Sequence, residues 1–429
     1  MKRRTFLATA AASLATPAVS QPARVLRFIP QADLSTIDPH WNTAYVTRNH
    51  GFMVFDTLYG MDSAYRATPQ MLAGHTTESD GLRWTLTLRD GLRWHDGTPV
   101  LARDCVASIR RWGSRDTFGQ ALLAATDELS APDDRTIVFR LSHPFPLLPD
   151  ALAKTAPSPC VIMPERLAAT DAFKQVSEMV GSGPYWFLPD ERVPGARVAY
   201  ARFDGYVPRP ASPNSDGTPS RTAGPKRPGF DRIEWLIIPD AATAGAALQA
   251  GEADWWLAAN PDLLPRLRAD RRLVVRTQDP TGIIGTMRFN QLHPPFDNPA
   301  IRRAILGAVT QADHMQAVSG PDRALDRSRR ELEAAGYKGE RVALLVPTDI
   351  PSTNALAEVT ADLFRRLGLN LDAQTMDWGT AVQRRTNMEP PERGGWSVFQ
   401  TSWSGLDHAT PAGHPFLRGN GLKAAPGWA

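Results

Sequence analysis

The chain has 429 residues, of which 42% are hydrophobic and 22% charged, a composition that supports more than one folded core and excludes disorder as the default. The net charge is +3, but three of the 48 basic residues lie in residues 1–20, which hold no acid, so 45 basic and 45 acidic residues remain. Nucleic-acid binding needs a clustered excess of Lys and Arg. The balance argues against nucleic acid and favours a small molecule or a protein as partner.

Residues 1–20 are typical of an export leader. Arg3 and Arg4 precede the mild apolar run Ala8–Ala15, and small residues at 18–20 predict cleavage before Gln21. The start resembles a twin-arginine signal, with an ordinary secretory signal as the alternative, and both lead out of the cytoplasm. No later segment approaches the roughly 20 apolar residues of a membrane span, and no Cys follows the leader, so we expect a mature protein without a lipid anchor.

The first half of the mature chain predicts an α+β unit over residues 53–182. Residues 83–88 alternate like a half-buried strand, and a turn at 90–91 predicts a hairpin that returns through 92–94. From Ala102 the apolar residues recur with a helical period, and 136–141 alternates again as a strand. Only Cys105 and Cys160 occur; buried free thiols are the preferred interpretation, with a disulfide as the alternative in an oxidising compartment.

The second half begins with a segment rich in Pro, Gly, Ser and Thr at 208–229, which predicts a surface loop without packed structure. A strand at 233–238 and a helix at 241–249 follow, the helix ending at Gly251. Asn298 and Pro299 predict a helix start.

A crossover unit is predicted near the end of the chain. It consists of a strand at 341–346, a helix at 354–367 that stops at Gly368, and a strand at 369–376. Two strands joined through a helix are expected to be parallel.

Motifs for catalysis are missing from the sequence. There is no Gly-x-Ser-x-Gly elbow, no His-Glu-x-x-His and no phosphate-binding loop, and His408 with His414 lacks the spacing and third ligand of a metal site. His95 and Asp96 are interpreted as turn residues. We therefore expect no catalytic residue, no metal ligand and no cofactor.

Twelve tryptophans are many for this length. Trp84 and Trp112 fit the buried faces of their predicted elements and are interpreted as core residues. Several others stand beside polar or turn residues, as expected of the walls of a solute cleft, although core filling is the alternative for each of them: Trp41, Trp378, Trp396 and Trp403.

The order of several short motifs resembles the signature of the family 5 extracellular solute-binding proteins, which include the peptide and nickel receptors of ABC importers. The densest part spans Leu72 to Trp112, with Asp80-Gly81-Leu82, Trp84-Thr85-Leu86, Leu88-Arg89-Asp90-Gly91, Trp94-His95-Asp96-Gly97-Thr98-Pro99 and Ala102-Arg103-Asp104. Further matches are Ile37-Asp38-Pro39-His40, Phe55-Asp56-Thr57-Leu58-Tyr59, Gly181-Ser182-Gly183-Pro184-Tyr185, Arg288-Phe289-Asn290 and Ala335-Gly336-Tyr337.

The resemblance implies an α/β fold of the periplasmic-binding-protein type, with two lobes and an inserted α+β subdomain. On this template residues 21–52 and 183–278 form lobe I, 53–182 the inserted subdomain, and 279–429 an incomplete lobe II. It also implies a monomeric periplasmic receptor without enzymatic activity, which captures a peptide-like solute between its lobes and delivers it to the membrane subunits of an ABC importer.

The same resemblance implies the ligand-binding residues. Asp407 lies in a Trp-x-x-x-Asp-x-x-x-Pro stretch like the one whose acid pairs with a peptide's ammonium group, against the alternative of a loop-capping Asp. Trp403 and Trp378 match aromatic walls, and Asn42 and Tyr45 follow the turn that faces the cleft.

Two departures from the family pattern widen the choice of solute and raise a question about the chain. Dipeptide receptors hold the ligand's carboxylate with an Arg after the strand at 341–346, whereas this chain has Pro347-Thr348-Asp349-Ile350. The solute is then a longer peptide, a cation or a non-peptide such as a nickel chelate, and an exported hydrolase is the alternative from another class. Members also normally continue beyond residue 429, so we expect a C-terminally truncated member with less constrained lobe closure.

Overall fold

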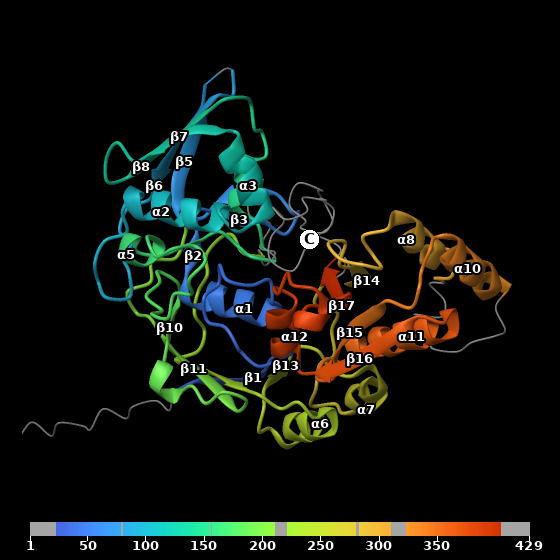
Figure 1. The fold of residues 1–429 in the computed structure, drawn as a ribbon. Coiled ribbons are helices and arrows are strands. Elements are labelled where there is room, and N and C mark those ends of the chain that lie inside the picture. Colours follow the sequence, from blue (N-terminus) through green and yellow to red (C-terminus); the bar gives the residue numbers. More distant parts are fainter. Residues whose placement is uncertain are drawn as a thin grey trace, which may run out of the picture.

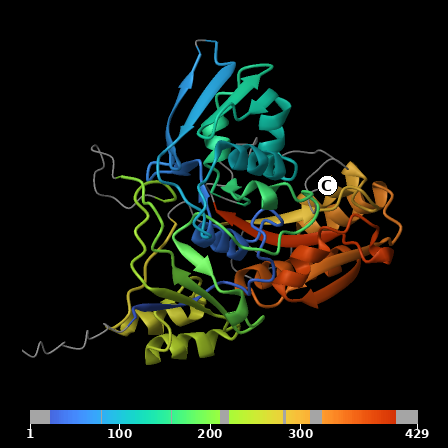
Figure 2. The same cartoon turned by 90° about the vertical axis from the view of Figure 1, so that its left-hand side faces the viewer.

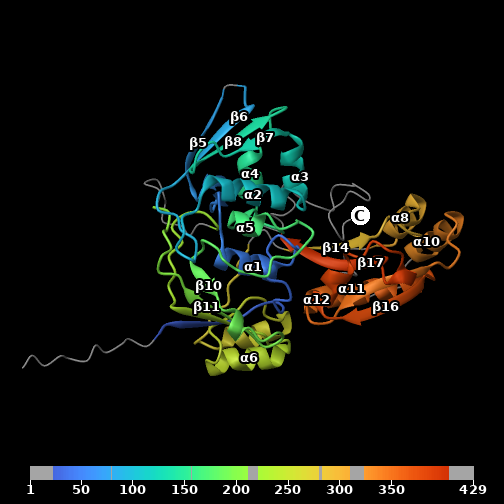
Figure 3. The same ribbon diagram turned by 60° about the vertical axis from the view of Figure 1, so that its left-hand side comes forward.

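The computed structural model describes residues 23–78, 80–155, 157–210, 221–279, 283–309 and 323–404. Three sheets of four or five strands organise these residues. We name them by one strand each: the β6 sheet, the β1 sheet and the β15 sheet. Figure 1 shows the β6 sheet above the β1 sheet, with the β15 sheet beside both, and a turned view separates the β15 sheet from the other two (Figures 1 and 3).

The β6 sheet is antiparallel, in the order β5-β6-β8-β7. Its strands are β5 (Leu72–Thr77), β6 (Arg83–Leu88), β8 (Thr136–Leu141) and β7 (Thr126–Ser130), and its main helices are α2 (Ala102–Gly113) and α3 (Thr117–Ala124). The predicted strands and helix are confirmed, and Trp84 and Trp112 are core residues. The predicted hairpin is wrong, because β6 pairs with β5 and β8, while Arg93 only bridges to Pro99 across a tight turn.

The β1 sheet runs β10-β11-β12-β1-β13, and β1 lies parallel to both of its neighbours. Its strands are β10 (Tyr185–Phe187), β11 (Arg197–Arg202), β12 (Arg232–Leu236), β1 (Val25–Ile29) and β13 (Trp255–Trp256). Together with helices α1 (Tyr45–Val54), α6 (Ala241–Ala250) and α7 (Leu264–Ala269) it forms what we call the β1 lobe. Phe28 faces the core shared with α1 and Ile29 the core shared with α6, as alternation along a strand requires.

Two short ladders and two short helices connect the β6 sheet to the β1 lobe. They are β2 (Asp56–Thr57) with β9 (Val161–Ile162), β3 (Tyr59–Met61) with β4 (Ala67–Pro69), α4 (Leu148–Leu152) and α5 (Glu165–Ala168). Val161, Met163 and Val176 pack into the core of the β1 lobe. The two cores therefore meet along 161–176, and the domain boundaries stay a prediction. Figure 2 shows these segments between the two sheets.

The segment at 208–229 contains no helix or strand in its described parts, 208–210 and 221–229. These parts are nevertheless anchored, which the sequence did not indicate. Lys226 Nζ lies 2.7 Å from the carboxylate of the buried Asp56, and Ala223 is itself buried against Gly60. Charge pairing and close backbone contact thus fix the ends of the loop to the body of the protein.

The β15 sheet has the order β14-β17-β15-β16. Its strands are β14 (Ile283–Phe289), β17 (Val398–Ser404), β15 (Arg341–Pro347) and β16 (Asn370–Met376), and its helices α8 (Pro299–Leu306), α10 (Arg323–Ala334), α11 (Pro351–Leu367) and α12 (Trp378–Arg384) complete the β15 lobe. The predicted crossover is confirmed: β15 and β16 are parallel and joined by α11, which ends at Gly368 with φ 81°. The predicted helix start is also confirmed, since Asn298 caps α8.

Alternation along β15 and β17 gives the sheet two different faces. Leu344 and Val398 face the core beneath α11, whereas Leu345, Phe399 and Trp403 face α12. Tyr45 of the β1 lobe packs against this second cluster. The α12 face of the β15 sheet is therefore the face turned toward the β1 lobe, as the position of α12 beside α1 shows (Figure 1).

Candidate functional site

The carboxyl ends of three parallel strands meet at one edge of the β15 sheet. β15 lies between β16 and β17 and runs parallel to both, so Pro347, Met376 and Ser404 end their strands on the same side. Ligands of open α/β sheets bind in the crevice outside the carboxyl ends of the strands, where loops rather than helices define the surface. The residues just beyond these ends are therefore candidates for ligand binding.

Trp403 and Tyr45 form a contact between the two lobes at this edge. The Trp403 side chain is 2% exposed, and its ring lies edge-on to that of Tyr45 with centroids 6.2 Å apart. The backbone N–H of Ser404 donates a hydrogen bond to the Tyr45 hydroxyl at 2.8 Å. Because Tyr45 is the first residue of α1, the first turn of that helix fixes the end of β17.

Trp378 begins α12 and lies in the same cluster. Its ring stacks on Phe399, with centroids 6.1 Å apart, and its backbone N–H donates to Asp349 Oδ1 at 2.7 Å. The indole Nε1 is buried and has no hydrogen-bond partner within the described ranges. A buried indole N–H normally finds an acceptor, so this atom is a candidate donor to a bound molecule.

Asn42 belongs to the turn that leads into α1. It is half-buried, and its Oδ1 accepts a hydrogen bond from the Ala44 N–H at 3.0 Å, which orients the start of the helix. The buried ion pair of Asp38 with Arg111, at 2.7 Å, anchors the start of this turn. Asn42 therefore shapes the turn that carries Tyr45.

The structure brings together Trp403, Trp378 and Tyr45, with Asn42 three residues before Tyr45. Asp407 lies outside the described residues, so its role as ammonium acceptor stays a prediction. The ligand-binding roles of the other four residues stay predictions as well. The other two tryptophans interpreted as cleft walls differ: Trp396 is a core residue that donates to the Arg385 carbonyl, and Trp41 lies under the Arg115 guanidinium at 4.3 Å.

Two further residues at this edge had no role in the prediction from sequence. Arg385 is buried after α12, its guanidinium hydrogen-bonds to Thr43 of the β1 lobe, and it lies 5.3 Å from the Phe399 ring centroid. Burial lowers its pKa to about 9. Asp349 lies two residues after β15, and burial raises the pKa of its carboxyl. In the sequence, the position of Asp349 stands out only because residues 347–350 depart from the family pattern. No sequence pattern indicates that Arg385 lies at this edge.

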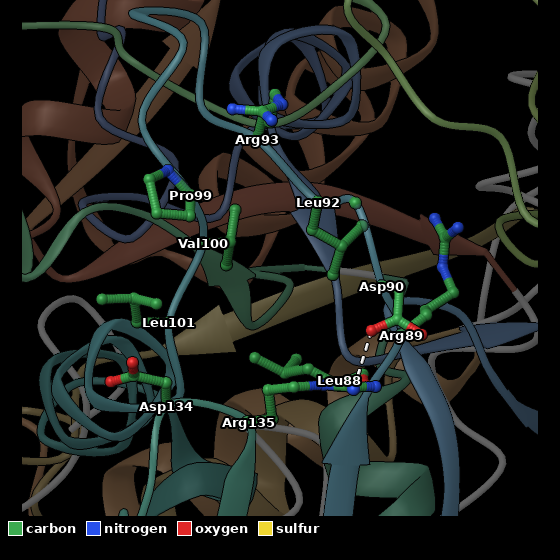
Figure 4. A pocket seen from close by; sticks show the side chains of 11 residues that line it. Leu88, Arg89, Asp90, Leu92, Arg93, Pro99, Val100, Leu101, Asp134 and Arg135 are labelled. Atoms are coloured by element: carbon green, nitrogen blue, oxygen red, sulfur yellow. Dashed lines mark hydrogen bonds and ion pairs between the residues drawn. The ribbon is translucent and has the colours of Figure 1, made fainter.

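A separate shallow pocket of about 240 Å³ lies in the β6 unit, between the turns at 89–93, 99–101 and 134–135 (Figure 4). Part of its polar lining is already paired within the protein. Arg135, whose side chain is half exposed, pairs at 2.7 Å with the largely exposed Asp90, while Arg93 donates to the Gly97 carbonyl. An exposed ion pair adds little binding energy, so this pocket is a weaker candidate than the edge of the β15 sheet.

Other features of the described residues narrow the chemistry. No helix among them is long and apolar enough to cross a membrane, and they contain no group of three or more potential metal-ligating side chains of His, Cys, Asp or Glu. Cys105 and Cys160 are buried free thiols, and burial raises the pKa of both. Deeply buried thiols of this kind are unreactive.

Solved structures with a two-lobe fold resemble the chain. AgaA from A. tumefaciens, in complex with agropinic acid, has a TM-score of 0.71 at 19% identity over 94% of this chain and 83% of that one. OppA of Haemophilus influenzae, in complex with the peptide RPPGFSPFR, has a TM-score of 0.70 at 17% identity over 95% and 85%. At such identities the likeness shows the fold alone: the α/β fold of the two-lobe solute-binding proteins, as the sequence predicted.

Sequence comparison identifies the family within that class. The model for bacterial extracellular solute-binding proteins, family 5 (middle), matches residues 66–421. A probable peptide ABC transporter periplasmic-binding protein of Sinorhizobium fredii is 35% identical over 426 residues, covering 92% of this chain and 78% of the relative. A glutathione-binding protein of Pectobacterium atrosepticum is 24% identical, covering 86% and 72%. The chain belongs to the family 5 bacterial extracellular solute-binding proteins, a family of solute-binding receptors.

Proposed function

We propose that the protein is the periplasmic receptor of an ABC importer and that it encloses a peptide-like solute between the β1 and β15 lobes. One observation carries this proposal: the carboxyl edge of the β15 sheet meets the β1 lobe through aromatic residues, Trp403 and Trp378 on one side and Tyr45 on the other. Aromatic walls with few polar groups suit a peptide, whose backbone and side chains need both apolar area and hydrogen bonds. The 35% identity to a probable peptide receptor supports this choice.

The proposal includes the roles and boundaries inferred from sequence. Residues 21–52 with 183–278 form one lobe, 53–182 an inserted subdomain and 279–429 the other lobe, and Asp407 accepts the ammonium group of the solute. The receptor is a monomer, has no catalytic activity and delivers its solute to the membrane subunits of the importer. Export uses the twin arginines Arg3 and Arg4, with cleavage before Gln21.

Thermal unfolding of the purified protein with a peptide library tests the receptor function. A ligand present at a hundred times its dissociation constant stabilises the folded state by about 2.7 kcal/mol, which shifts the melting temperature measurably. We expect at least one peptide to produce such a shift, and Asp407→Asn to weaken its binding about tenfold through loss of a charged hydrogen bond. Shifts only with nickel chelates or opines would replace the peptide by those solutes, and peptide turnover would favour a hydrolase.

A further inference from the structure

We propose that Asp349 gives the cleft a preference for peptides with a positively charged side chain. The inference rests on the proposed receptor function and deepens it by naming a class of peptide.

Asp349 occupies the edge where the proposed cleft lies. β15 is an inner strand of its sheet and ends at Pro347, so a side chain two residues later stands beyond the carboxyl ends of the parallel strands. Its neighbour Ile350 packs at the border of the aromatic cluster that also contacts Tyr45. The carboxylate is therefore part of the wall that the β15 lobe turns toward the β1 lobe.

Backbone hydrogen bonds fix the Asp349 carboxylate, and the one from another residue reaches Oδ1. Oδ1 accepts from the Trp378 N–H at 2.7 Å, which ties the loop after β15 to the start of α12. The backbone N–H of Asp349 itself also hydrogen-bonds the carboxyl, but within the described ranges no further residue donates to it and no Lys or Arg forms an ion pair with it. The same Trp378 carries the buried indole N–H that has no partner in the described part of the chain. The Trp378 indole can donate to a peptide carbonyl of the ligand, and the Asp349 carboxylate can accept from a cationic group.

Asp377 provides an internal contrast at the same edge. It caps α12, with Oδ1 accepting from the Thr380 N–H at 2.9 Å and Oδ2 from the Thr380 hydroxyl at 2.5 Å. Although burial opposes it, these bonds lower the pKa of Asp377, whereas burial raises the pKa of Asp349. Of the two neighbouring acids, Asp377 serves the fold and Asp349 retains acceptor capacity.

A half-buried carboxylate without a cation is poorly compensated for the water it loses. A ligand ammonium or guanidinium group restores that compensation through a charge-assisted hydrogen bond, and a ligand carboxylate at the same place is repelled. The expected result is discrimination by charge at one residue of the bound peptide.

Isothermal titration with three sets of tripeptides tests this inference. Each set places Lys, Gln or Glu at one position of an otherwise all-Ala peptide. For the wild-type protein we expect the Lys peptide to bind about tenfold more tightly than the Gln peptide at one position, with the Glu peptide weakest. In Asp349→Asn the difference between Lys and Gln falls below about twofold, while the affinity for the Gln peptide is kept.

Asp377→Asn is the matched control, because it removes the same charge from the same edge but from a carboxylate already used as a cap. It keeps the Lys preference even though its melting temperature falls. Equal loss of affinity for all peptides in Asp349→Asn makes the residue structural and overturns the inference, as does a wild-type protein that binds peptides without charge preference. If the wild-type protein binds none of a broad peptide library, the proposed function itself fails.

Discussion

Replacing Tyr45 by Phe tests the hydrogen bond that its hydroxyl accepts from the other lobe. The substitution keeps the ring that packs edge-on against Trp403 and removes only the hydroxyl that accepts from the Ser404 N–H at 2.8 Å. A neutral hydrogen bond contributes about 1 kcal/mol net, and more when a buried donor is left without an acceptor. If the bond forms when the lobes close, its loss lowers solute affinity by about fivefold or more, since 1.4 kcal/mol corresponds to tenfold.

Tyr337→Phe is the control for that experiment. The Tyr337 hydroxyl also accepts from a backbone N–H, that of Asn370 at 2.7 Å, but both residues belong to the β15 lobe. Both variants should lose some thermal stability, whereas only Tyr45→Phe should weaken binding in isothermal titration with the best peptide. Equal affinities of Tyr45→Phe and wild type would refute the role of this bond in closure, and an equal loss in Tyr337→Phe would show that the effect is not specific to the interface.

Three further predictions concern the stability of the fold. Burial lowers the pKa of His95 to about 4, so the folded state keeps the ring neutral, whereas the unfolded chain protonates it below about pH 6.5. The stability that depends on neutral His95 is therefore fully present above about pH 6.5 and falls by on the order of 3 kcal/mol toward about pH 4. His95→Gln should flatten this pH dependence of the free energy of unfolding, measured with urea at several pH values. Asp38→Asn should cost about 3–5 kcal/mol in the same assay, because it leaves the buried guanidinium of Arg111 without its counter-charge; the double variant with Arg111→Met should recover part of the loss. Gly181→Ala should lower the melting temperature sharply, because its Cβ would lie 1.9 Å from the Val54 carbonyl oxygen.

Each of these predictions has a result that contradicts it. An unchanged acid slope in His95→Gln would mean that other groups cause the acid lability. If the double variant Asp38→Asn with Arg111→Met is no more stable than Asp38→Asn alone, the unpaired charge of Arg111 is not the source of the lost stability. Gly74→Ala is the control for Gly181→Ala, since nothing lies within 4 Å of its added Cβ, and equal melting temperatures of the two would contradict the steric argument.

The sequence by itself determined the local elements with a clear period and a clear stop. The helix that ends at Gly368 and the parallel strands on either side were predictable because a 3.6-residue period, a glycine in the left-handed region and a two-residue alternation are local signals. The family was predictable as well, from the order of short motifs. His95 shows the limit of such signals: it stands in a turn, yet it is buried and its ring hydrogen-bonds with the backbone of Gly181 and Gly183.

The pairing of strands and the meeting of the lobes were decided only by tertiary structure. β6 pairs with β8, about 50 residues away along the chain, rather than through the nearby Asp-Gly turn, because a turn signal does not specify which strand covers the core. Likewise, no local pattern indicates that Tyr45 meets Trp403 or that Arg385 hydrogen-bonds to Thr43. Nor does one indicate that Asp377 uses both carboxylate oxygens as a cap, whereas among the described residues Asp349 accepts from another residue only at Oδ1. Most of these contacts join residues on different elements, far apart in the sequence. They form only when the sheets have assembled and have brought those elements together.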